Sequence, residues 1–386
     1  MSKKEKTEKT EKTVVYEPQP IRPCAKRARI NIKVLKHVRQ GVLCVDSAQK
    51  VCWDPVFRVF TPYSSGQQVK RCIIQLMCTV IGVLLSPITF WSKITDKGVD
   101  KIGEHQIWSS CNPKYVNELV GGHMKTRKRG AGDAFGIGTK KRRGPVSFSA
   151  LTVLHALLSV VFDECVTFDR SGIPGNIVHV VDADENEIPA EEVKKFCDNF
   201  EVNIPARHFV KPQKRMGGLF VHTVIIDQNA LFTVQLDERE PSIDDCVRDE
   251  LISLGWLQTV NDKGKCLVAP KSVRDQVIPA LAHAIINWTV DSNQSRSSTE
   301  FQTVAVAMSK TSPKVWNSIS AVVSKADDGK SMATPVLRKY DGVDLFVDDS
   351  ASQFFFEAET DEDALLKAEA RIIEMLNDFD YENQMV

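Results

Sequence analysis

A run of twenty residues without a charged side chain, Cys72 to Trp91, is the strongest single constraint on how this chain folds. The run is flanked by basic residues and has the length of a membrane-spanning helix. Gln75, Ser86 and Pro87 interrupt it and leave about 10–14 strongly apolar residues, a length typical of a helix buried in a protein core. We therefore expect a core helix over 72–86, with a single-pass, membrane-associated protein as the alternative.

Basic and acidic residues are divided unevenly along the chain. Residues 1–150 hold 28 Lys and Arg against 11 Asp and Glu, whereas residues 151–386 hold 22 against 39, although the net charge of the whole chain is zero. A strongly basic segment of this size points to a polyanion as its partner. The sequence therefore predicts nucleic-acid binding by the first part of the chain.

The residue pattern predicts an α+β fold that is mainly helical. Strand-like stretches occur in 30–60 and 177–236, and helical patterns dominate after Ser242. Phe148 to Phe162 is apolar nearly all round, so we expect a central helix there. The chain then divides into two lobes, of which the second, the C-terminal third, is helical. The expected divisions are a disordered basic arm over 1–29, an α+β lobe over 30–240, a helical lobe over 241–359, and an acidic terminal helix and tail over 360–386.

Four further elements are expected within this outline. Ala190–Phe200 reads as an amphipathic helix, and 273–288 as a helix kinked at Pro279. Two strands, 219–226 and 231–236, read as a hairpin. The terminal helix over 360–379 carries an apolar stripe, which can pack on its own core or dock on a neighbouring copy. The stripe includes Leu365, Ile372, Leu376 and Phe379.

A Gly-rich basic segment, 125–144, is the sharpest functional signal. Two basic clusters, Lys125 to Arg129 and Lys140 to Arg143, flank the sequence GAGDAFGIGT. Glycines let an exposed loop wrap onto phosphates without steric conflict, so we expect contacts to nucleic acid here. The same spacing is typical of a bipartite nuclear-import signal, whose partner would be a nuclear import receptor. A merely solvated loop is the third interpretation.

Two smaller basic stretches support the same function. One is Lys26-Arg27-Ala28-Arg29, and the other runs from Arg207 to Arg215 with Phe209 among its cations. Cations interleaved with an aromatic ring suit single-stranded nucleic acid, because rings stack on bases while cations follow the backbone. The residues expected to contact nucleic acid are Lys26, Arg27, Arg29, Lys125, Arg127, Lys128, Arg129, Lys140, Lys141, Arg142, Arg143, Arg207, Lys211, Lys214 and Arg215.

The sequence gives no sign of catalysis. The glycines of 130–138 have neither dinucleotide-binding nor P-loop spacing, and metal-protease and serine-hydrolase motifs are absent. Asp182 and Asp184 begin like a calcium loop that then fails, although a nuclease-like magnesium site remains an alternative. We therefore expect a protein that is not an enzyme, with no cofactor, no resident metal and no catalytic residues. Ten scattered cysteines without C-x-x-C are typical of reduced, intracellular proteins.

The layout resembles the nucleoproteins of negative-strand RNA viruses, especially those that replicate in the nucleus. The matching features are the extended arm 14–29, the basic loop 125–143, the helix-rich last third and the terminal helix 360–379. The resemblance implies two lobes with a basic cleft that encapsidates single-stranded RNA (or DNA), self-assembly into a homo-oligomer, and a location in the nucleus, the cytoplasm and the virion. The alternative of the same kind is a capsid or shell protein with a genome-binding basic arm.

Overall fold

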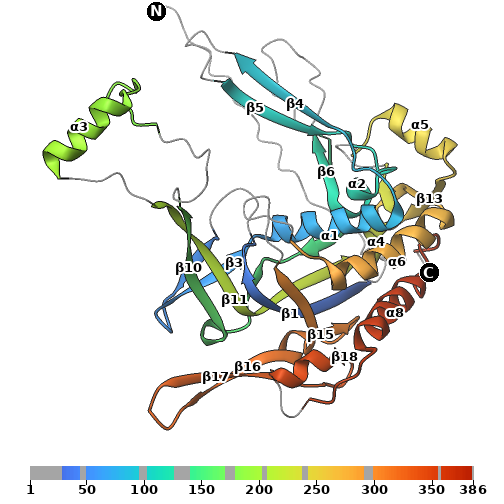
Figure 1. The fold of residues 1–386 in the computed structure, drawn as a ribbon. Coiled ribbons are helices and arrows are strands. Elements are labelled where there is room, and N and C mark those ends of the chain that lie inside the picture. Colours follow the sequence, from blue (N-terminus) through green and yellow to red (C-terminus); the bar gives the residue numbers. More distant parts are fainter. Residues whose placement is uncertain are drawn as a thin grey trace, which may run out of the picture.

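A large antiparallel sheet organises the computed structural model, which describes residues 28–43, 49–94, 102–125, 140–169, 179–201, 207–236, 242–290, 299–354 and 358–384. The strand order is β18-β15-β1-β11-β9-β3-β2, with β8 and β10 also paired to β11. Strands from the two ends of the chain thus lie side by side (Figure 1). The strands are β1 Arg29–Gly41, β2 Val51–Asp54, β3 Val59–Ser64, β8 Val146–Phe148, β9 Leu151–Val153, β10 Ser159–Asp169, β11 Arg207–Asp227, β15 Glu300–Ser309 and β18 Asp344–Val347.

The strand β1 lies inside the sheet, with one apolar face and one mixed face on which Asn31, Lys33 and His37 accompany Leu35. Ile30, Ile32 and Val34 are fully buried on one face, and Leu35 is buried on the other. β1 pairs antiparallel with β11 on one side and with β15 on the other. Apolar residues that alternate with polar ones are typical of a strand, and this part of the expected strand region is confirmed.

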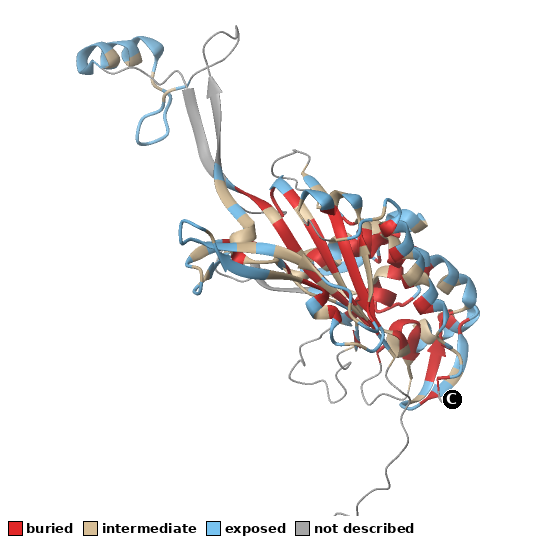
Figure 2. Cartoon of the chain, turned by 90° about the horizontal axis from the view of Figure 1, so that it is seen from below, coloured by how far each residue is buried: buried red, intermediate tan, exposed pale blue. Residues whose placement is uncertain are grey.

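Three helices cover one face of this sheet: α1 (Gly66–Ile81), α6 (Lys271–Asn287) and α8 (Ala364–Asn377). The Ser65 hydroxyl caps the start of α1 by accepting from the Gln68 N–H, and Gly82 ends the helix in the left-handed conformation. Figure 2 shows the buried residues concentrated in the sheet and these helices.

In α8, Ala368, Ile372 and Leu376 are buried in the core of their own chain. The apolar stripe is therefore used within the chain and is not free for a neighbour.

The remaining elements form smaller sheets and surface helices. They are β4 Ile88–Ile94, β5 Ile102–Ser109, α2 Val116–Gly121, β6 Gly122–Lys125, β7 Lys140–Arg143, the 3-10 helix η1 Ala156–Leu158, α3 Ala190–Phe200, α4 Gln228–Leu231, β12 Thr233–Gln235, α5 Asp245–Ser253, β13 Leu257–Asn261, β14 Gly264–Val268, α7 Val315–Ser318, β16 Ile319–Lys325, β17 Ser331–Leu337 and the 3-10 helix η2 Asp349–Gln353. The predicted helices over 190–200 and 273–288 are confirmed as α3 and α6, with Pro279 inside α6.

The prediction of a mainly helical fold is wrong. The last third holds β13 to β18 besides its helices. The segment Phe148 to Phe162 is not a central helix but β8, β9, η1 and the start of β10. A short apolar run fits a buried strand as well as a buried helix, so periodicity alone could not decide between them. The expected hairpin 219–236 is also wrong, since β12 pairs with β14 and α4 separates it from β11.

The uncharged run 72–91 is divided between helix, loop and strand. α1 supplies its first half and ends at Ile81, and β4 begins at Ile88. Val69, Ile73 and Met77 of α1 are buried against the sheet, as expected of a core helix. In the part of the chain that the structure describes, no helix is long and apolar enough to cross a membrane.

Candidate nucleic-acid interface

The strands β6 and β7 form a hairpin at the two ends of the Gly-rich basic segment. β7 consists of the four cations of the second cluster, and strand geometry sends alternate side chains to opposite faces. Lys141 and Arg143 are exposed, whereas Arg142 is buried. Lys140 points back to the body and lies 3.3 Å from the Asp244 carboxylate. Two of the four cations are therefore free to meet a ligand.

Arg142 is held inside the protein by backbone carbonyls. Its guanidinium donates to the carbonyl of Leu119 at 2.6 Å and to that of Ala230 at 2.8 Å. It also donates to the carbonyls of Glu118, Leu231 and Thr233. Arg142 thus joins β7 to α2 and to the chain around α4, and we leave it out of the proposed contacts.

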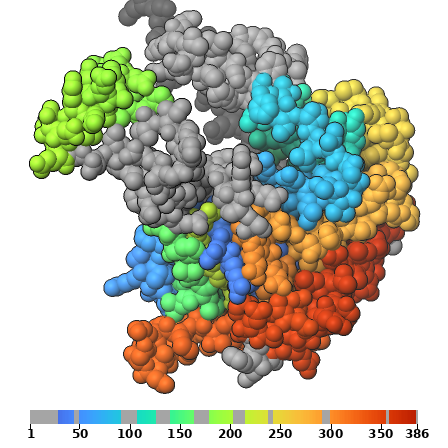
Figure 3. All heavy atoms as spheres, in the orientation of Figure 1, coloured from blue at the N-terminus to red at the C-terminus, as the bar shows by residue number. Residues whose placement is uncertain are grey.

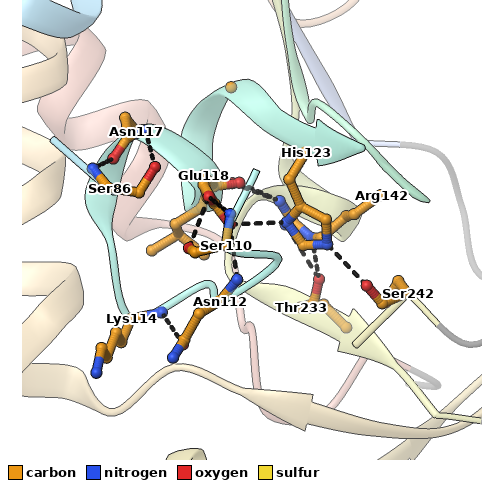
Figure 4. Close-up of polar contacts among 12 residues, drawn as sticks. Ser86, Ser110, Asn112, Lys114, Asn117, Glu118, His123, Arg142, Thr233 and Ser242 are labelled. Carbon is orange, nitrogen blue, oxygen red and sulfur yellow. Dashed lines mark hydrogen bonds and ion pairs between the residues drawn. The ribbon is translucent and has the colours of Figure 1, made fainter. Parts of the chain in front are cut away.

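A buried polar network surrounds this anchor (Figure 4). The Glu118 carboxylate accepts from the backbone N–H of Ser110 at 3.0 Å and of Asn112 at 2.6 Å. His123 of β6 lies 3.4 Å from Glu118 and 2.8 Å from the Ser242 carbonyl. Because charged and polar groups this deeply buried are costly unless satisfied, the network fixes the position of the hairpin relative to the body.

The exposed face of β7 opens onto a groove of about 480 Å³. Arg29, at the start of β1, and Lys263, in the turn between β13 and β14, line the same groove as Lys141 and Arg143. These four cations, which we call the basic groove set, come from three segments far apart in the sequence. Within the described residues, none of the four side chains forms an ion pair. The acidic side chains lining the groove are Asp227 and Asp262.

Polar groups of the protein complete the groove. Ser147, Asn229, Thr233, Gln235, Asn261 and Gln384 line it between the cations. Cations and neutral hydrogen-bonding groups together suit a ligand with phosphates and polar edges, as in a nucleic acid. The groove as a whole is therefore chemically matched to a polyanion with exposed bases.

A second cavity, of about 750 Å³, lies at the opposite end of β1. Arg39, Phe162, Arg215 and Gly217 line it together with His37. Burial lowers the pKa of His37, and the neighbouring Arg39 lowers it further, so the imidazole is neutral at pH 7. Glu300 also lines this cavity and lies 3.5 Å from the Arg39 guanidinium, so the cavity is less basic than the groove beside β7. Arg215 therefore lines a different cavity from the β7 hairpin.

Two adjacent glycines at this cavity give a matched test of the fold. Gly218 has a φ of +125°, and a Cβ there would lie 2.2 Å from the Leu158 carbonyl oxygen, whereas a Cβ on Gly217 meets nothing closer than 3.4 Å. We expect Gly218→Ala to lower the free energy of unfolding by about 3 kcal/mol or more. Gly217→Ala should change it by less than about 1 kcal/mol. Urea unfolding of both variants checks this, and equal losses would contradict it.

The sequence-predicted contact residues are distributed over several places. Arg29, Lys141 and Arg143 line the groove, Lys125 lies on β6, and Arg215 lines the second cavity. Lys214 is exposed and lies 3.5 Å from Asp163 across the β10–β11 ribbon. Arg207 and Lys211 are on the outer part of β11. Lys26, Arg27, Arg127, Lys128 and Arg129 lie outside the described residues.

Sequence reasoning missed Lys263 and Arg39. Each is a single cation next to an acid or an amide, and no local pattern distinguishes it from an ordinary surface residue. The turn sequence Asn261-Asp262 before Lys263 indicates only a hairpin.

The acidic pair proposed for magnesium forms a turn. The Asp182 carboxylate accepts the backbone N–H of Asp184 and of Asn186, each at 2.9 Å. These hydrogen bonds hold its pKa below the usual range. No group of three or more His, Cys, Asp or Glu side chains with the geometry of a metal site occurs in the described part of the chain.

Comparisons with known proteins give no family. No protein-family model and no curated protein matches the chain. Among solved structures, a chain of a "CRISPR RNA-guided surveillance complex" aligns with a TM-score of 0.41 and 10% identity, over 90% of this chain and 99% of that one. A chain of a "CRISPR RNA-guided surveillance complex, pre-nicking" gives a TM-score of 0.40 and 9% identity, over 91% and 89%. At TM-scores of this size we draw no conclusion about function.

Proposed function

We propose that the protein binds single-stranded RNA, without a catalytic step, through the groove beside β7. The observation that carries the proposal is the convergence of Arg29, Lys141, Arg143 and Lys263 on one groove, with no ion pair to any described residue. Free cations brought together from separate segments repel one another, so an anionic ligand stabilises their arrangement.

The groove supports binding of a strand more than binding of a small phosphate. Its cations are spread over β1, β7 and the β13–β14 turn, with amide and hydroxyl groups between them. Phosphate contacts of this kind position a strand without reading its sequence. We therefore propose low sequence preference, and coating of a long strand by repeated copies as in a nucleoprotein.

Nuclear import through 125–143 is not favoured by the position of β7. Arg142 is buried and Lys140 lies against Asp244, so only half of the second cluster is exposed. An import receptor that reads all four cations would have to detach β7 from the body.

The salt dependence of binding tests the proposal. Replacing the four residues of the basic groove set by Gln removes four phosphate contacts, and each contact to a single strand contributes about 0.7 to the slope of log affinity against log salt. We expect the slope to become shallower by about 3. The measurement is fluorescence anisotropy of a labelled mixed-sequence RNA between 50 and 300 mM salt, with a DNA of the same sequence in parallel.

A matched variant separates the groove from net charge. Lys325, Lys330, Arg338 and Lys339 are exposed on or next to the β16–β17 hairpin, and changing them to Gln removes the same charge elsewhere. This variant should keep the wild-type slope. Equal losses in both variants, or an unchanged slope in the first, would show that the groove does not hold the strand.

A further inference from the structure

A groove of about 550 Å³, lined by both apolar and polar side chains, lies where the end of α1 meets α6 and α8. Its apolar lining consists of Val80, Ile81, Pro279, Ala280 and Ile373. Val80 is 51% exposed, and Leu84, in the loop after α1, is 87% exposed. Exposed apolar side chains in and after such a groove are typical of a protein–protein contact.

The rim of this groove is acidic. Asp275 and Glu369 line it, with His283 beside them. Glu369 accepts from the Asn287 amide at 2.6 Å and lies 3.2 Å from His283, which keeps its carboxylate in place. Asp275 lies 2.7 Å from the exposed Lys271 ammonium. Because an exposed ion pair contributes little, a partner's cation can replace Lys271 beside Asp275, and a partner that combines apolar side chains with a cation complements the groove.

The tip of the β2–β3 hairpin has this chemistry. Trp53 and Phe60 face each other across the hairpin with ring centroids 5.0 Å apart, and both are more than half exposed. Val56 in the turn is 77% exposed. Arg58 is exposed beside them, and no described residue forms an ion pair with it.

The hairpin tip is held in shape before any contact. The Asp54 carboxylate accepts the backbone N–H groups of Val56 and Phe57, each at 2.9 Å, and the Phe57 ring packs against His155 at 4.6 Å. A preorganised tip loses little conformational entropy on docking. Exposed aromatic rings on such a tip are suited to serve as the anchors of an interface.

We propose that the β2–β3 tip of one copy docks into the α1–α6–α8 groove of a second copy, with Trp53 and Phe60 against the apolar lining and Arg58 at the acidic rim. The tip and the groove lie on opposite sides of the molecule (Figures 1 and 3). One copy cannot close this contact on itself, because its own tip faces away from its own groove. A contact between two different surfaces repeats head to tail and builds rings or filaments.

Charge reversal tests the pairing directly. In nuclease-treated, RNA-free protein, we expect concentration-dependent oligomers in analytical ultracentrifugation. Arg58→Glu alone and Asp275→Arg alone should each weaken association at least tenfold. An equimolar mixture of the two variants should associate again, because the altered tip of one variant meets the altered groove of the other, and the remaining tip and groove are unaltered. Failure of the mixture to associate would overturn the pairing, and monomers of wild-type protein at all concentrations would overturn the contact itself.

The aromatic anchor gives a second test with a matched control. Trp53→Glu should abolish the oligomers, whereas Phe196→Glu, which alters an equally exposed aromatic residue on α3, should leave them intact. Circular dichroism and thermal unfolding of each variant report on the fold. Oligomers that survive Trp53→Glu in a folded protein would contradict the proposal. RNA binding by the groove beside β7 does not enter either experiment, so the two proposals fail independently.

Discussion

Replacing Arg142 by Met should lower the free energy of unfolding by about 3–5 kcal/mol, because several buried carbonyls lose their donor at about 1–3 kcal/mol each. The guanidinium donates to five backbone carbonyls, which belong to α2, α4 and β12. Methionine fills a similar volume but donates no hydrogen bond, so these buried carbonyls lose their partner. Urea unfolding followed by tryptophan fluorescence measures the loss.

The neighbouring position provides the control for this prediction. Lys141 is exposed on the same strand, and Lys141→Met should change the free energy of unfolding by no more than about 0.5 kcal/mol. In RNA binding at fixed salt the order of the effects should be reversed. Lys141→Met should weaken affinity more than Arg142→Met, because Lys141 is proposed to contact the RNA directly. Equal stability of the two variants would mean that Arg142 does not anchor the hairpin.

Lys36 should make the protein more stable as the pH rises from 7 towards 10. Its ammonium is fully buried and donates to the Ile286 and Trp288 carbonyls and the Thr303 hydroxyl. Burial lowers the pKa of Lys36 to about 7 from 10.5. Between these values the unfolded chain binds a proton that the folded chain does not, so raising the pH favours the folded chain.

The size of this effect follows from the displacement of the pKa. Between the pKa of Lys36 in the folded chain and that in the unfolded chain, the free energy of unfolding rises by about 5 kcal/mol. About 2 kcal/mol of this rise falls between pH 7 and 9. The measurement is the difference in free energy of unfolding between the wild type and Lys36→Met at pH 7, 8 and 9, because groups common to both cancel. From pH 7 to pH 9, the free energy of unfolding of the wild type should rise by about 2 kcal/mol relative to that of Lys36→Met. No change with pH would show that Lys36 is charged in the folded protein throughout this range.

Predicting this fold from sequence succeeded where a helical period was long and failed where apolar runs were short. The pattern of 273–288 is long enough to define a helix, and α6 is there despite Pro279. Phe148 to Phe162 is short and mixes valines, which favour strands, with leucines and alanines, which favour helices, so its local preference is ambiguous. Pairing with β11, a strand some seventy residues later, decides its structure, and local sequence carries no record of that partner.

The candidate site was predictable in part. The basic run at 140–143 was predicted as a contact from the sequence. Treating it as a strand would have placed Lys141 and Arg143 on one face and Lys140 and Arg142 on the other. Which of the two pairs faces inward depends on the carbonyls around α2 and α4, and those are tertiary contacts. The contribution of Lys263 could not be found, because only the fold brings the β13–β14 turn to the groove.

The position of β1 beside β15 has a consequence for synthesis of the protein on the ribosome. Arg39 and Glu300, which lie opposite each other at one end of this pair, are 261 residues apart in the chain. At about 5–20 residues per second, β1 leaves the ribosome about 10–50 seconds before β15 exists. During that interval one edge of β1, whose Ile30, Ile32 and Val34 form an apolar face, has no native partner to pair with. We expect the nascent chain to depend on chaperones over this period, and its yield to respond to changes in translation speed downstream of β11.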